Sequence, residues 1–178
     1  FMRVIAILFF LVAALFAHQK PVSKFVSSGR VVDLAYSSNN LFAATDAGIV
    51  DVFNYKTKKN IQKIKFDKIK DFAGDKVNAK IYSVDVYGDS LLVLVQGEGG
   101  FGEVYIYEKN RLQKIIPASK QLAIAKAAFI DKENILLGLL SDELLSYNIK
   151  SAKQNYLVQV SGGRFSDFSL NESRSEVV

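Results

Sequence analysis

Short runs of alternating apolar and polar residues fill most of the chain, and these runs come in groups of four. The first group covers residues 31–36, 41–45, 49–53 and 61–66, with polar turns such as Asp46-Ala47-Gly48 between the runs. Runs of this length, bounded by Gly, Asn, Asp and Ser, are typical of β-strands joined by hairpins. The group therefore predicts four short antiparallel strands.

The same group recurs further along the chain. Its second copy covers residues 82–87, 91–95, 103–107 and 111–116, its third covers 125–130, 135–140, 143–147 and 155–160, and a fourth opens at 164–169. Four strands in about 40 to 45 residues form the repeat of WD40-type β-propellers. We therefore expect an all-β fold in which residues 18–178 are the N-terminal part of a WD40-like β-propeller. The expected blades are approximately 29–66, 82–116, 124–160 and a partial 164–178.

Two markers support this alignment of the repeats. Asp33, Asp85 and Asp167 are placed at one repeat position, with Ala128 in the third copy. The third strand of each copy ends in an aromatic and a polar residue, which are Phe53-Asn54, Tyr107-Glu108 and Tyr147-Asn148. WD40 repeats place Trp-Asp at the corresponding point.

A four-stranded sheet cannot bury both of its faces alone, which explains why such repeats assemble radially. Residues 91–95 and 135–140 are nearly all apolar, as expected for strands covered on both faces. Three blades and a fragment cannot close a ring, so we expect the sequence to be truncated. Residues 67–81 form an extra connector that could hold a helical turn, and residues 21–28 could supply the outer strand of the last blade.

The N-terminus predicts export. Met2-Arg3 gives a positive start, and residues 4–17 form an uncharged apolar run of 14 residues that ends at Ala17. This pattern describes a secretory signal peptide at residues 1–17, because a membrane span needs about 20 residues. An uncleaved N-terminal anchor is the alternative. After cleavage we expect a periplasmic protein without membrane contact.

Composition narrows the chemistry further. The chain has no cysteine, so it forms neither disulfides nor thiolate metal sites. The formal net charge is +5, carried mostly by lysines, and seven lysines lie within residues 56–70. Lysines beside strands usually solvate turns and protect sheet edges. An exported protein rarely meets nucleic acid, so no nucleic-acid partner is expected.

The most specific motif is Gly97-Glu98-Gly99-Gly100-Phe101-Gly102, which matches the G-x-G-x-x-G pattern of nucleotide-binding loops. Such loops need a following helix or a nearby lysine, whereas residues 103–107 alternate like a strand. We therefore interpret the motif as a hairpin loop between two strands of the second blade and expect no bound cofactor.

Other candidate residues also have structural explanations. His18 is the only histidine, so no Ser-His-Asp triad and no imidazole metal site is expected. Asp33, Asp85 and Asp167 could form a cation-binding ring in the channel, but hydrogen bonds to backbone amides at blade junctions are the favoured interpretation. The following aromatic residues are expected in the core: Phe25, Phe53, Tyr105, Phe129 and Phe168. The sequence thus predicts no catalytic, cofactor-binding or metal-binding residue.

One family resemblance goes beyond the fold. The order of the segments GDKVNAKIYSVDV, LLVLVQGEGGFGEVYIYEKNRLQKIIPASK, ILLGLLSDELLSYNIK and GRFSDFSLNES resembles the NapL-type accessory propeller, encoded in periplasmic nitrate reductase operons of epsilonproteobacteria. The resemblance covers roughly residues 20–178. Unlike ordinary WD40 repeats, this chain contains no Trp and no Gly-His dipeptide.

The resemblance implies a function without catalytic residues. It implies a non-catalytic periplasmic scaffold that supports the nitrate reductase system by binding its protein components. Two alternatives stay open, because a fold alone does not define a function. One is an outer-membrane assembly propeller, against which the missing lipidation cysteine counts. The other is a quinone-cofactor dehydrogenase propeller, whose repeats usually carry tryptophan.

Overall fold

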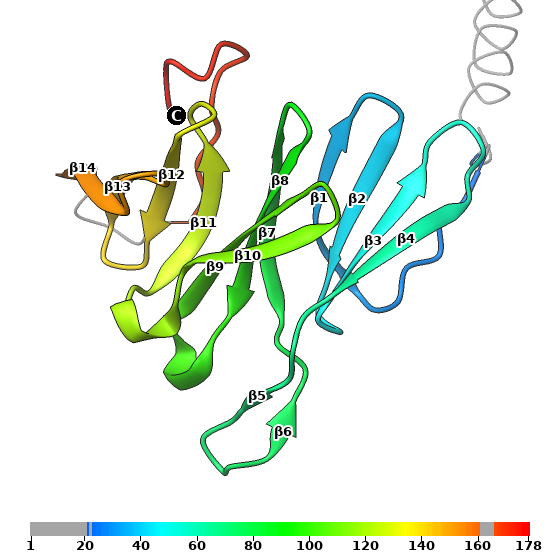
Figure 1. Cartoon of the computed structure of the whole chain (residues 1–178), viewed down its shortest axis with the longest axis horizontal. Helices are drawn as coiled ribbons and strands as arrows, with labels where there is room; N and C mark the ends of the chain where they lie inside the picture. Colours follow the sequence, from blue (N-terminus) through cyan, green and yellow to red (C-terminus); the bar gives the residue numbers. More distant parts are fainter. Residues whose placement is uncertain (1–20, 22, 161–165) are drawn as a thin grey trace, which may run out of the picture.

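The computed structural model describes residues 21, 23–160 and 166–178 (Figure 1). Regular structure in these residues consists of β-strands and two short 3₁₀ turns, Glu98–Gly100 and Ala118–Lys120. None of the described residues belongs to a helix that is long and apolar enough to cross a membrane. The predicted signal peptide at residues 1–17 and His18 lie outside the described residues.

Three four-stranded antiparallel sheets form the body of the molecule. Blade one consists of β1 (Val31–Ser37), β2 (Asn40–Thr45), β3 (Ile49–Asn54) and β4 (Asn60–Lys65). Blade two consists of β7 (Ile81–Tyr87), β8 (Ser90–Gln96), β9 (Gly102–Glu108) and β10 (Arg111–Ile116). Blade three consists of β11 (Ile124–Phe129), β12 (Asn134–Leu139), β13 (Glu143–Asn148) and β14 (Lys153–Gln159). Each sheet is a meander, so the predicted all-β fold with three four-stranded repeats is confirmed.

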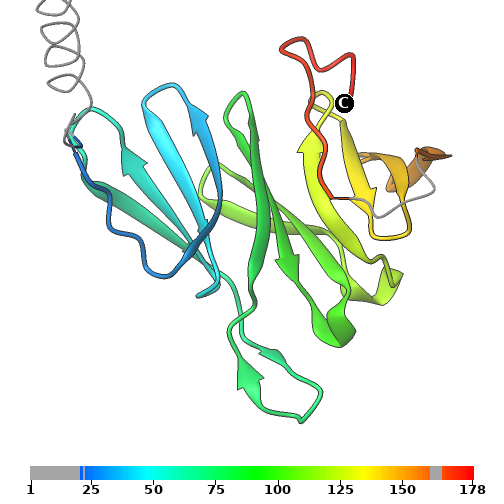
Figure 2. The ribbon, with the colours of Figure 1, turned by 180° about the vertical axis from the view of Figure 1, so that it is seen from behind.

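The three blades stand side by side in an open arc (Figures 1 and 2). Their first strands lie together on the inner side of the arc, where β7 contacts both β1 and β11. Their last strands, β4, β10 and β14, are therefore the outer strands. This arrangement is the radial stacking of a β-propeller.

The core lies between the blades rather than inside any one of them. In β8, Leu91, Val93 and Val95 pack against blade one, whereas Leu92 and Leu94 pack against blade three. All five side chains are almost fully buried. Because successive residues of a strand point to opposite faces, a middle strand between two neighbouring blades must be apolar at every position. The uninterrupted apolar run at residues 91–95 follows from this geometry.

The aromatic marker of the repeat is confirmed by the strand registers. Phe53, Tyr107 and Tyr147 all lie near the end of a third strand. They pair with Leu41, Leu91 and Ile135 at the start of the neighbouring second strands.

The aspartate marker is wrong by two residues in the first repeat. Asp85 and Ala128 pair with equivalent residues of their second strands. Asp33 instead pairs with Ala44, which lies two residues further along its second strand than the equivalent position. Ser83 therefore occupies the position of Asp33 in blade two. Each first strand contains a bulge at the same point, just before Asp33, Ser83 and Lys126, so the bulges do not cause the offset. The two aspartates simply occupy positions two residues apart on the same face of their strands.

The connector between blades one and two differs from the expectation of a helical turn. It forms a small hairpin of β5 (Ile69–Lys70) and β6 (Lys76–Val77), which projects away from the blades (Figure 1). The side-chain oxygen Oδ1 of Asp71 accepts hydrogen bonds from the backbone amides of Ala73 and Asp75, both at 2.9 Å. An Asp that caps its own turn in this way favours a hairpin over a helical turn.

The predicted first strand of a fourth blade, residues 164–169, is not a strand where the structure describes it. Residues 164 and 165 lie outside the described part, and 166–169 run beside blade three without sheet pairing (Figure 2). Leu170 forms an isolated bridge with Val177. Phe168 is buried against the face of blade three that points away from blade two, beside Leu136 and Leu144. The segment thus covers part of the face on which another blade would stack.

The segment before blade one also forms no strand where it is described. The ring of Phe25 packs edge-on against that of Phe53, with their centroids 5.2 Å apart. The carboxylate of Asp51, which is completely buried, accepts hydrogen bonds from the backbone amide and the hydroxyl of Ser28 at 2.6 and 2.8 Å. The segment is therefore fixed on blade one, and its assignment to the outer strand of a last blade stays a prediction.

The expected core aromatics divide into two groups. Phe53, Phe129 and Phe168 are buried, as predicted. Phe25 and Tyr105 are only half-buried.

Candidate functional site

The glycine-rich motif joins two strands of blade two, as predicted. Gly97 to Phe101 form the loop between β8 and β9, and Gly102 is the first residue of β9. Gly99 and Gly100 have φ angles of 68° and 81°. Such angles are easily adopted only by glycine, so the hairpin itself requires two of the four glycines.

The other two glycines are required by close packing. A Cβ atom on Gly97 would lie 2.7 Å from Cγ of Glu103 and 2.8 Å from Cβ of Ala118. A Cβ atom on Gly102 would lie 3.0 Å from Cβ of Ile124 in blade three. Backbone geometry and packing thus account for the whole motif without a phosphate.

A charged cluster lies beside this loop. Oε1 of Glu103 accepts hydrogen bonds from Nζ of Lys114 at 2.8 Å and from the backbone amide of Ala118 at 3.3 Å. Oε2 accepts one from the hydroxyl of Tyr105 at 2.7 Å. Partial burial acts to raise the pKa of Glu103, but these three donors outweigh it and hold the pKa below its ordinary value. Burial and the bond to Glu103 raise the pKa of Tyr105 to about 12.

The lysine-rich stretch follows turns and an outer strand, as its composition predicts. Lys56, Lys58 and Lys59 lie in the turn between β3 and β4, and Lys63 and Lys65 lie on the outer strand β4. The ammonium group of Lys58 lies 3.7 Å from the centroid of the Tyr55 ring. The stretch is thus spread over several elements.

The aspartates of the first strands connect neighbouring blades, as favoured from the sequence. Oδ2 of Asp33 in blade one accepts a hydrogen bond from the backbone amide of Val84 in blade two at 2.9 Å. Oδ2 of Asp85 accepts one from the amide of Phe129 in blade three at 2.7 Å. In blade two, Ser83 performs the role of Asp33, because its hydroxyl accepts a bond from a blade-three amide at 3.1 Å.

Two of the three aspartates, Asp85 and Asp167, have basic partners, and none of the three binds another. Asp85 binds Arg174 through two bonds of 2.6 and 3.0 Å, and Asp167 binds Nζ of Lys126 at 2.6 Å. Within the described part of the chain, no group of three or more His, Cys, Asp or Glu side chains could hold a metal ion. The cation-binding ring that the sequence left open is therefore not assembled by these residues.

Arg174 is a residue that sequence reasoning missed. Its guanidinium group also donates hydrogen bonds to the carbonyl oxygens of Phe129 at 2.6 Å and of Val86 at 3.0 Å. The bonds to Asp85 raise the pKa of Arg174 above its ordinary value. The side chain thus links the C-terminal segment to blades two and three together. No sequence pattern pointed to it, because its partners lie 45 to 89 residues away along the chain.

A tight turn presents this arginine. The side-chain oxygen of Asn171 accepts hydrogen bonds from the backbone amides of Ser175 at 2.9 Å and Glu176 at 3.2 Å, and the backbone amide of Arg174 bonds to the carbonyl of Asn171. The turn is closed on its other side by the Leu170 to Val177 bridge. Such an Asx-type turn favours a fixed loop over a loose tail.

The first strands and this turn enclose a cleft of about 380 Å³. Its lining comes from β1, β7, β11 and the C-terminal segment, and it includes Asp33, Leu34, Lys126 and Glu172. Leu34 leaves more than half of its surface exposed. In a propeller this is the position of the central channel, where residues from several blades meet.

The charge of the cleft is negative after internal pairing. Both of its basic side chains, Lys126 and Arg174, are held by aspartates, as described above. Among the described residues, neither Asp33 nor Glu172 has a basic side chain as a partner. The cleft therefore offers two carboxylates and one exposed leucine, a combination that suits a partner segment with basic and apolar side chains.

Solved structures share the arrangement of the blades. The β-propeller domain of Cps50 (Swd1) from Myceliophteria thermophila aligns with a TM-score of 0.63 at 14% identity, over 88% of this chain and 50% of that one. The WD40 β-propeller domain of Doa1 gives a TM-score of 0.65 at 8% identity, over 85% and 47%. The computationally designed Ika4 protein gives 0.58 at 13% identity, over 87% and 88%. No family model and no curated protein sequence matches the chain.

These likenesses define the class of protein to which the fold corresponds. The chain has a WD40-like β-propeller fold, and it spans about half the length of the Cps50 and Doa1 domains. At these identities the likeness concerns the fold alone.

Proposed function

We propose that this protein is an exported, non-catalytic scaffold that binds a protein partner in the cleft at its first strands. The cleft carries this proposal, because it combines an exposed leucine with two carboxylates that have no basic partner. The hydrogen bond from the Val84 amide holds Asp33 in place, and the Asn171 turn orders the segment that carries Glu172. A rigid frame lowers the entropy lost on binding, which favours recognition of a partner.

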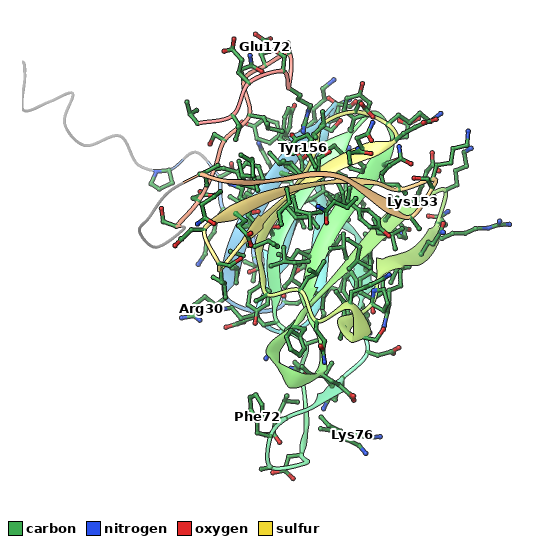
Figure 3. The ribbon with its side chains drawn as sticks, turned by 90° about the vertical axis from the view of Figure 1, so that its left-hand side faces the viewer. Arg30, Phe72, Lys76, Lys153, Tyr156 and Glu172 are labelled. Carbon is green, nitrogen blue, oxygen red and sulfur yellow. The ribbon has the colours of Figure 1, made fainter. Side chains whose placement is uncertain are left out.

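The partner that suits this cleft is an extended segment or loop with an apolar side chain and a basic one. The apolar side chain would cover Leu34, and the basic one would lie between Asp33 and Glu172. Glu172 stands at the tip of the C-terminal turn, at one end of the molecule, where it is accessible to a large partner (Figure 3). Charge of this kind contributes more to the rate and specificity of association than to its affinity.

We further propose that the partner belongs to the periplasmic nitrate reductase system. The support is the resemblance to the NapL-type accessory propeller, and the exported location follows from the signal-like residues 1–17. Mass spectrometry of the periplasmic fraction should find a mature N-terminus near His18. A protein that keeps Met2 and stays in the cytoplasm would contradict export.

Co-purification from periplasm tests the scaffold role with two matched pairs of variants. Leu34→Ser and Glu172→Lys change the cleft, whereas Leu112→Ser and Glu98→Lys make the same changes at exposed positions outside it. We expect nitrate reductase subunits to co-purify with the full-length protein and with both controls. Their loss in the cleft variants alone would support the proposal.

Equal recovery with all four variants would contradict binding in the cleft. Recovery of no nitrate reductase subunit, from cells that export the protein normally, would contradict the choice of partner.

A further inference from the structure

The hairpin of β5 and β6 carries the most exposed aromatic side chain in the described part of the chain. Phe72 lies at its tip with 94% of its surface exposed. The hairpin projects from the end of the molecule opposite to Glu172 (Figure 3). Its base is anchored, because Ile69 packs against the core between blades one and two. The tip of the hairpin therefore lies far from Glu172 in the cleft.

The turn that carries Phe72 is fixed by its own hydrogen bonds. Oδ1 of Asp71 binds two backbone amides of the turn, and the backbone amide and carbonyl of Asp71 bond to Asp75 and Gly74 at 3.0 and 3.1 Å. A single exposed apolar residue is common on protein surfaces and needs no explanation by itself. An aromatic ring held outward on an ordered, protruding turn is a different case, because little entropy would be lost when a partner covers it.

A second, independent feature of the hairpin points to a ligand. Lys70 and Lys76 are directly opposite each other in the β5–β6 pairing, so that two ammonium groups share one face. Among the described residues neither group has an acidic partner. Like charges at directly opposed positions destabilise a sheet, and this hairpin has only two residue pairs to resist the effect. An acidic group from outside would remove the repulsion.

We propose that this hairpin is a second docking element, which inserts Phe72 into an apolar pocket on a partner protein while carboxylates at the pocket rim bind Lys70 and Lys76. Exposed aromatic side chains that fill a pocket are typical anchors of protein interfaces. A membrane surface fits less well. One exposed aromatic residue and two lysines supply little of the apolar area and basic charge that stable binding to an anionic lipid surface needs. This second element does not depend on the cleft or on the identity of its partner.

In-cell photo-crosslinking tests the proposal with the full-length protein. A photoreactive phenylalanine analogue replaces Phe72, and the same analogue at Tyr156, an exposed aromatic position on β14, is the control (Figure 3). We expect a crosslink to one protein at position 72 that is absent at position 156. The crosslinked protein is then purified, and its affinity for the unmodified chain is measured.

Two variants separate docking from a purely structural role. Phe72→Ser should weaken the measured affinity at least tenfold. The double change Lys70→Glu with Lys76→Glu should weaken it similarly, and this loss of affinity should be larger at low salt, where charge repulsion is screened least. Neither variant should shift the thermal unfolding midpoint of the free protein.

Three results would overturn the proposal. The first is an unchanged affinity in both variants. The second is a crosslink that is absent at position 72 or identical at position 156. The third is saturable binding of the full-length protein to vesicles of equal parts phosphatidylglycerol and phosphatidylcholine, if Phe72→Ser abolishes that binding.

Discussion

Replacing Asp85 with alanine should destabilise the junction of blades two and three. Its carboxylate accepts one hydrogen bond from the Phe129 amide and two from Arg174, and both charged side chains are about one-fifth exposed. A buried amide left without a partner costs about 1–3 kcal/mol. Losing a partly solvated ion pair adds about 1 kcal/mol. We therefore expect Asp85→Ala to lower the free energy of unfolding by roughly 2–4 kcal/mol.

A double-mutant cycle with Arg174→Ala isolates the ion pair. The single change Arg174→Ala should cost roughly 1–2 kcal/mol, because Asp85 keeps the Phe129 amide and can be solvated. The coupling energy between the two positions should be about 1 kcal/mol, since residues in direct contact do not behave additively. Asp89→Ala, two residues beyond the end of β7, removes an exposed carboxylate and should leave the free energy of unfolding unchanged.

Urea denaturation followed by tyrosine fluorescence and circular dichroism measures all four proteins, because the chain lacks tryptophan. If the two variants Asp85→Ala and Asp89→Ala have the same free energy of unfolding, the view that the first-strand aspartates hold the blades together is refuted. A coupling energy near zero would refute the specific link between Asp85 and Arg174.

Three further predictions follow from buried or crowded groups. The pKa of Glu103 is lowered in the folded state, so its contribution to the free energy of unfolding is present above about pH 4.3 and is lost as the pH falls further. The free energy of unfolding of Glu103→Gln should therefore depend less on pH in this acidic range, and identical profiles of the variant and the unchanged protein would contradict this. Asp51→Ala removes the fully buried acceptor of Ser28 and should cost roughly 2–4 kcal/mol and expose the preceding segment to proteolysis; an unchanged cleavage pattern would contradict it. Gly102→Ala should lower the free energy of unfolding in urea by about 1–3 kcal/mol, because the added Cβ would crowd Ile124. An unchanged free energy of unfolding would contradict this and would show that Ile124 can shift to make room.

The repeat could be predicted from the sequence because each blade has its own local pattern. Apolar runs such as residues 91–95 are buried on both faces, so their composition alone identifies middle strands. The aromatic residue at the end of each third strand, as in Phe53 and Tyr107, was placed correctly because no bulge interrupts the pairing of the second and third strands. The offset of Asp33 could not be seen, because an aspartate at either of two positions of the first strand can accept a hydrogen bond from a backbone amide of the next blade, as Asp33 and Asp85 do.

The site was harder to predict than the fold. Arg174 binds residues of blades two and three that are distant in the sequence, and only the fold brings them together. The blade-junction bonds of Asp33 and Asp85 were foreseen, since polar side chains on inner strands need backbone partners. Asp167 instead pairs with Lys126. Phe72 was not singled out, because a connector that was expected to hold a helical turn gives no sign that a hairpin tip will expose it.

The affinity of the purified full-length protein for the purified periplasmic nitrate reductase tests the central proposal most directly. Isothermal titration calorimetry should show saturable binding in the micromolar range or tighter, equivalent to about −8 kcal/mol or better. Glu172→Lys should weaken the binding at least tenfold, and the matched Glu98→Lys should not. Absence of binding at tens of micromolar protein, or equal affinity of the two variants, would contradict a scaffold that binds this enzyme in its cleft.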